Sequence, residues 1–150
     1  MTTATTTASL LRLNKEESLM LADPAEDIRN RQVLDLEGEV IASVEDLLID
    51  AEEHKVRLLM VGSGGHGPLR IGKKKFLIPV DAITGIDTEG VHVDQTGDRI
   101  AESPEYDPEV VPAPVYVERL YGWYGYYPFW RPFYRYPEYP YFTYRRYGRR

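Results

Sequence analysis

The 150-residue sequence contains no cysteine, which excludes disulfide bonds, thiol nucleophiles and thiolate metal sites. It has no stretch approaching the ~20 consecutive apolar residues that a membrane-spanning helix needs. The N-terminal stretch MTTATTTASLLRLNKEE lacks the basic segment and the apolar segment of a signal peptide. From these absences we expect a cytoplasmic protein with no membrane span.

Carboxylates are scarce at the C-terminal end. From Tyr116 onward the chain has seven arginines, no lysine and two glutamates, a charge of +5, whereas the residues before it carry −11. An acidic body joined to a basic tail favours head-to-tail association, or an anionic partner for the tail alone. Solvated surface charge explains the body, but it does not explain the tail, where aromatic side chains alternate with arginines.

Short apolar segments separated by turn residues fill the middle of the chain. Val40, Ala42 and Val44 alternate with polar neighbours, and turns are expected at residues 37–39 and 88–90. Closely spaced short strands without an intervening helical pattern are typical of an antiparallel barrel or sandwich. We expect one face of these strands to form the core, namely Val33, Val44, Leu48, Leu58, Met60, Phe76, Ile78, Val80 and Val93.

Two segments in this part of the chain, DPAEDIRNRQVLDLEGEVIASVEDLLIDAEEHKVRLLMVGSGG and KKKFLIPVDAITGID, resemble the PRC-barrel family. The resemblance covers residues 23–108 and depends most on EDLLID and IPVDAI. It implies a small, six-stranded, partly open antiparallel β-barrel that acts as a non-catalytic adaptor, often self-associates and docks on a larger assembly. SPEYDPEVV and ERLYGWYGYYPFW resemble the extension of free-standing bacterial members, which are connected loosely with stress response.

The sequence divides into four parts: a flexible N-terminal arm (1–22) whose residues 10–22 pack on the domain, the barrel (23–110), a helix-containing extension (111–127) and a Tyr/Arg/Pro-rich tail (128–150). Pro114 and Gly125 are suited to the first turn and the end of a short helix. We expect this helix to cover the barrel. The prolines of the tail prevent a continuous helix, so we expect the tail to be extended and to reach outward.

The motifs that could carry chemistry are weak. The loop GSGGHG with Lys73–Lys75 could hold an anion, but it lacks the ending of a phosphate-binding loop, and a solvated hairpin loop is the favoured interpretation. His54, His66 and His92 do not have the spacing of a metal site. Asp81, inside an apolar strand, is expected to accept hydrogen bonds from a turn backbone. We therefore predict no catalytic, cofactor-binding or metal-binding residue, and a protein that is not an enzyme.

These patterns favour an adaptor that self-associates, with a homodimer as the preferred state. Nucleic-acid binding by the tail is the first alternative, because aromatic rings stack on bases and arginines pair with phosphates. Peripheral attachment to a membrane complex is the second. The sequence leaves the identity of the partner and the number of subunits open. The predicted partner-binding residues are Trp123, Tyr124, Tyr127, Phe129, Trp130, Arg131, Tyr134, Arg135, Arg145 and Arg146.

Overall fold

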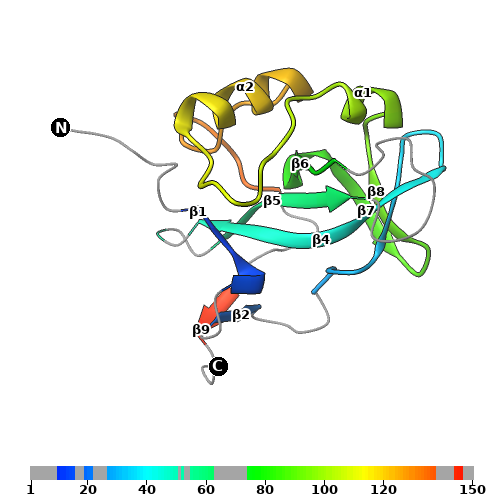
Figure 1. Cartoon of the computed structure of the whole chain (residues 1–150), viewed down its shortest axis with the longest axis horizontal. Coiled ribbons are helices and arrows are strands. Elements are labelled where there is room, and N and C mark those ends of the chain that lie inside the picture. The colour runs from blue at the N-terminus through cyan, green and yellow to red at the C-terminus, as the bar shows by residue number, and fades with distance from the viewer. Residues whose placement is uncertain are drawn as a thin grey trace.

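The structure is a computed structural model that describes residues 10–15, 19–21, 27–50, 52, 55–62, 74–137 and 144–146, with only the backbone at 19–21 and 144–146. Figure 1 shows a curved sheet with two helices above it. The strands of the main sheet are β1 (Leu10–Arg12), β3 (Gln32–Leu34), β4 (Val40–Asp50), β5 (Lys55–Gly62), β6 (Phe76–Pro79), β7 (Ile83–Asp87) and β8 (Gly90–Val93). Short 3-10 turns follow β1 (Leu13–Lys15) and β6 (Val80–Ala82).

The main sheet has the strand order β6-β5-β4-β3-β8-β7, and β1 pairs with β4 beside β3. It stays open, which confirms the predicted all-β, partly open barrel. Two details differ from the prediction. The sheet has seven strands, because the N-terminal arm adds β1 along β4. The pair β3–β8 is parallel, since the chain runs through β4 to β7 before β8 returns beside β3, and this excursion supplies the long crossover that parallel strands need.

The strand β4 does not alternate between buried and exposed residues as predicted. Val40 is 37% exposed, but Ile41, Ala42 and Val44 are all buried, with Ser43 between them. The pairing of β3 with β4 shifts register at Ile41, since Val33 faces Ala42 and Leu34 faces Val40, and the pairing of β4 with β5 shifts between Val44 and Asp46 and between Leu48 and Ile49. Each shift bends the strand and changes the direction of the following side chains, so a simple two-residue period is not kept.

The predicted core is confirmed. All nine residues expected to be buried are at most 4% exposed, and they belong to one cluster that extends from β1 into the C-terminal helix. The predicted hairpin between β7 and β8 is also present, with the turn at residues 88 and 89. Consecutive residues of β5 and β6 are buried, so apolar side chains packed on both faces of these strands hold this fold together.

Two helices lie on the same side of the sheet (Figure 1). α2 (Pro114–Tyr124) begins with its proline in the first turn and ends at Gly125, whose φ of 85° is the left-handed conformation that glycine adopts readily. It buries Leu120 and Tyr121 against the core, which confirms the predicted cover. The sequence interpretation missed α1 (Gly97–Ala101), because five residues are too few to show a helical period.

A second, two-stranded sheet joins the two ends of the chain. β2 (Leu19–Leu21) pairs antiparallel with β9 (Tyr144–Arg146), and Figure 1 shows both at the lower left. Within the described residues, the far end of the tail thus lies against the N-terminal arm. None of the helices in the described part of the chain is long and apolar enough to cross a membrane.

Candidate interaction site: an aromatic strap on the barrel

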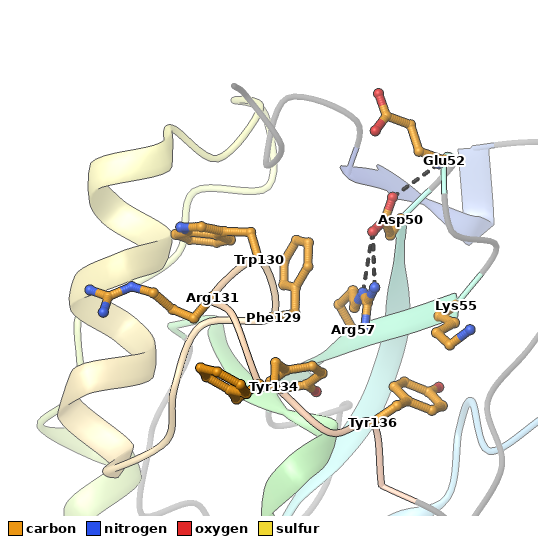
Figure 2. A pocket seen from close by; sticks show the side chains of 10 residues that line it. Asp50, Glu52, Lys55, Arg57, Phe129, Trp130, Arg131, Tyr134 and Tyr136 are labelled. Atoms are coloured by element: carbon orange, nitrogen blue, oxygen red, sulfur yellow. Dashed lines mark hydrogen bonds and ion pairs between the residues drawn. The ribbon is translucent and has the colours of Figure 1, made fainter. Parts of the chain in front are cut away.

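Residues 128–137 form a strap that follows α2 and crosses the beginning of β5 (Figures 1 and 2). Its prolines exclude regular structure, and it folds as successive turns in which Arg131 N donates to Pro128 O and Tyr134 N donates to Arg131 O. The sequence predicted that this segment reaches outward. For the strap this is wrong, because Phe129 is only 7% exposed and its neighbours Tyr134 and Tyr136 are half-buried.

The strap covers a buried ion pair. Arg57 of β5 lies 3.2 Å from Asp50 at the end of β4, and their side chains are only 5% and 3% exposed. The Arg57 guanidinium lies 4.3 Å from the ring centre of Phe129, 5.5 Å from that of Tyr136 and 5.8 Å from that of Tyr134 (Figure 2). Buried charges need such partners, and aromatic rings attract a desolvated cation. The need for cover explains why the strap folds back.

Two hydroxyl groups fasten the strap to the barrel. Tyr134 donates to Asp81 Oδ2 at 2.9 Å, and Tyr136 donates to the carbonyl oxygen of Val56 at 3.1 Å. Burial raises the pKa of Asp81, an effect that the Tyr134 hydrogen bond opposes. Burial, and next the Asp81 carboxylate, raise the pKa of Tyr134. The sequence predicted that a turn backbone would donate to Asp81, but a tyrosine of the strap does so, and no spacing rule indicates so distant a partner.

The other inward aromatic residues connect the helices with the strap. Trp123 Nε1 donates to the carbonyl oxygen of Arg99 at 2.9 Å, and the Arg99 guanidinium lies 4.4 Å from the indole ring. The Trp130 ring packs edge-on against Tyr121, with ring centres 6.4 Å apart. Tyr124 is 5% exposed. These residues, which the sequence assigned to partner binding, serve contacts within the chain.

The outward residues of the region have no such role. Tyr127 is 72% exposed and Phe133 is 97% exposed, and Arg135 is exposed as well. Arg131 is exposed but lies 3.2 Å from Glu118 of α2. Arg145 and Arg146 lie in β9, and their side chains are outside the described residues. The structure thus separates the predicted partner-binding residues into an inner and an outer group.

Comparison with known families decides the classification. The model of the PRC-barrel domain matches residues 21–100, more than half of the chain. The chain belongs to the PRC-barrel family. PRC-barrel domains are generally non-catalytic, and membership points to a protein-interaction module. A search of curated proteins finds no match. The matched region ends before α2 and the strap.

A hollow of about 470 Å³ lies between the strap and the PRC barrel, where β4 ends and β5 begins (Figure 2). Asp50, Glu52, Lys55 and Arg57 contribute its barrel side. Asp50 already accepts from Arg57 and from the backbone N–H of Glu52, and Lys55 lies 5.4 Å from the ring centre of Tyr136. The polar groups of the hollow therefore bind one another, an arrangement suited to holding the strap in place.

The candidate metal and anion residues of the PRC barrel lie partly within the described residues. His54, His66 and the loop residues 63–73 lie outside the described residues. His92 Nε2 lies 3.1 Å from both carboxylate oxygens of Asp87, and Glu89 completes a group whose ligand atoms are within 4.8 Å of one another. The group is mostly exposed, and hydrogen bonding within the β7–β8 turn accounts for it.

Proposed function

We propose that this chain is a non-enzymatic, cytoplasmic PRC-barrel interaction protein that binds copies of itself through the outer face of its strap, and so docks on a larger assembly. The stress-related role of similar free-standing proteins is part of the same proposal. The observation that carries it is the conformation of Phe133. This residue is 97% exposed and has a φ of 68°.

Both features of Phe133 are energetically unfavourable in a chain that has no binding partner. A left-handed conformation costs a residue with a side chain about 1–2 kcal/mol, and glycine would adopt it without that cost. A fully exposed ring adds no packing within the described chain. Strained residues cluster at binding sites, where the strain has a purpose. Contact with another molecule would bury this ring and explain why a phenylalanine stands there.

The surroundings of Phe133 support a protein contact. Tyr127 and Arg135 are exposed nearby in the sequence, and Arg131 lies between them. Aromatic residues and arginine are the side chains most enriched at the energetic centres of protein interfaces. We therefore propose Tyr127, Arg131, Phe133 and Arg135, with Arg145 and Arg146, as the contact surface. Phe133 was not among the predicted residues, since composition alone does not tell which rings of a turn point outward.

Nucleic acid remains the alternative partner of the same arginines. One feature counts against it, because Phe129, Tyr134 and Tyr136 surround the Arg57 guanidinium and are engaged there rather than offered to bases. Stacking on exposed aromatic faces is the main contribution to single-strand binding. Attachment to a membrane complex through the exposed rings is the third hypothesis, and the experiment below distinguishes the three.

The test is sedimentation velocity of the full chain over a concentration and salt series. Phe133→Gly removes the ring and the backbone strain, and Val115→Ala, which trims an exposed side chain of α2 (67% exposed), is the matched control. We expect the parent and Val115→Ala to associate, also at moderate salt, and Phe133→Gly to stay monomeric. A truncation after Tyr127 is unsuitable, because it would remove the buried Phe129.

Other outcomes decide against self-association. A parent that is monomeric at every concentration overturns it. Tight binding of single-stranded oligonucleotide that weakens steeply with salt and is abolished in Arg135→Ala would favour nucleic acid. Co-flotation of the parent, but not Phe133→Gly, with anionic lipid vesicles would favour a membrane surface.

A further inference from the structure

The turn between β3 and β4 presents an apolar side chain among acidic ones. Residues 36–40 are all exposed, and Leu36 is 62% exposed. Glu37 and Glu39 follow it on the chain, and Asp98 of α1 is also exposed. A single exposed leucine is ordinary on a protein surface. Its rigid support and the charge around it make this one a candidate contact.

The buried carboxylate of Asp35 fixes the shape of this turn. Asp35 is 5% exposed and accepts from the backbone N–H groups of Glu37 at 2.9 Å, Glu39 at 3.0 Å and Gly97 at 3.2 Å. The N–H of Leu36 itself donates to the carbonyl oxygen of Gln95 at 2.9 Å. A surface that is already held in one conformation loses little conformational entropy on binding. The turn therefore holds Leu36 in a position that needs no rearrangement to bind.

The turn and the strap carry opposite charges, and both combine an exposed apolar side chain with charged neighbours. Each has one highly exposed apolar side chain, Leu36 in the turn and Phe133 in the strap. Carboxylates accompany the first, and exposed Arg131 and Arg135 accompany the second. Apolar contact surrounded by opposite charges gives both affinity and specificity. The strap therefore fits the turn, and not another strap, where arginines would face arginines.

The strap and the turn lie in different parts of the molecule. Figure 1 shows the β3–β4 turn at the right end of the molecule, beyond α1, and the strap on the left, below α2. A two-fold dimer joins one surface patch to the same patch on its partner. A strap–turn contact joins two different surfaces, so a pair of copies held by one such contact leaves the turn of one copy and the strap of the other available.

Building on the self-association proposed above, we infer that the strap of one copy binds the β3–β4 turn of the next, with Phe133 against Leu36 and Arg135 beside Glu37. The copies thus associate head to tail through two different surfaces, an arrangement that can extend to a ring or a growing chain. The partner of the strap is a second copy of this chain, and the acidic turn is its receptor surface.

The experiment uses full chains with one surface disabled in each. The turn variant is Leu36→Lys/Glu37→Lys, and the strap variant is Phe133→Gly/Arg135→Glu. Each alone is expected to associate at least about tenfold more weakly in apparent Kd, which corresponds to about 1.4 kcal/mol of binding free energy. Mixed in equal amounts, they are expected to form a dimer of twice 17.3 kDa and nothing larger, since each retains one intact surface.

The matched control is Glu89→Lys, which makes the same substitution as Glu37→Lys in the exposed β7–β8 turn and is expected to associate like the parent. Thermal melting of every variant checks that it is folded. If the parent associates, but the turn variant does so equally well and the mixture gives no dimer, the head-to-tail inference is wrong and the proposed function stands. If the parent itself stays monomeric, the proposed function fails first.

Discussion

The inner and outer faces of the strap each carry a phenylalanine, but one ring is buried and the other is exposed. Phe129, Tyr134 and Tyr136 surround Arg57 of the barrel, whereas Phe133 and Arg135 are exposed to solvent. Composition therefore does not tell which aromatic residue stabilises the chain and which one meets a partner. The two turns within these ten residues bury some aromatic side chains and expose others. Substitutions of buried residues should therefore change stability, and substitutions of exposed residues should change association.

The largest expected loss of stability is for Arg57→Ala. It leaves the buried Asp50 carboxylate without its cation and removes the centre of three ring contacts. Breaking a buried pair on one side costs about 3–5 kcal/mol, which chemical denaturation would measure. The double substitution Asp50→Asn/Arg57→Met removes both charges and should recover much of the loss. If Arg57→Ala unfolds like the parent, the strap does not depend on this pair.

Phe129→Ala and Phe133→Ala compare the two faces directly. Phe129 is 7% exposed, so its truncation should cost about 3–5 kcal/mol, as for other buried phenylalanines. Phe133→Ala, at a 97% exposed side chain, should change stability by no more than about 0.5 kcal/mol. The free energy of unfolding in denaturant provides both values. Equal losses in the two variants would mean that the strap has no distinct inner and outer face.

Tyr134→Phe and Tyr121→Phe compare two buried hydroxyls. The first removes the donor to Asp81 and should cost about 1–3 kcal/mol, because a buried carboxylate loses its partner. The Tyr121 hydroxyl has no hydrogen-bond partner among the described residues, so its removal should leave the melting temperature nearly unchanged. A larger effect for Tyr121→Phe than for Tyr134→Phe would contradict the assignment of Tyr134 as a fastening residue.

The smallest effect concerns pH. Burial raises the pKa of Asp81, so the folded state binds the proton of this carboxyl group more tightly than the unfolded state does. The stability that comes from this difference is lost as pH rises through the folded pKa. Asp81→Asn keeps an acceptor for Tyr134 without the charge. Its melting temperature should therefore rise relative to the parent from pH about 4 upward.

Asp87→Asn is the control for this pH dependence. The hydrogen bond from His92 lowers the pKa of Asp87, so the parent becomes more stable relative to this variant as pH rises. A difference between Asp81→Asn and the parent that stays constant with pH would show that Asp81 does not change its charge with folding.

The sequence was sufficient to predict the barrel, its core and the helix. Periodic apolar residues such as Phe76 and Ile78 report burial directly, and Pro114 with Gly125 mark the two ends of α2. The parallel pair β3–β8 could not be predicted, because short strands do not encode which neighbour they meet. α1 was too short to show a period.

The site was predictable only in outline. Arg57 stands in an otherwise apolar strand, and this was a signal that the sequence interpretation did not use, since a charge there needs a partner. The partners Phe129, Tyr134 and Tyr136 come from a distant segment, and nothing in the local sequence pairs them with it. Phe133 differs from them only through its turn, which is a property of the folded chain.

Hydrogen exchange of the unmodified chain at low and high concentration tests most directly whether the outer face of the strap joins copies of this protein. At high concentration, exchange should slow for the amides around Phe133 and for those of the β3–β4 turn. The amides of the β7–β8 turn should exchange at an unchanged rate. Exchange that does not depend on concentration in the strap, or that slows elsewhere and not there, would contradict the proposal.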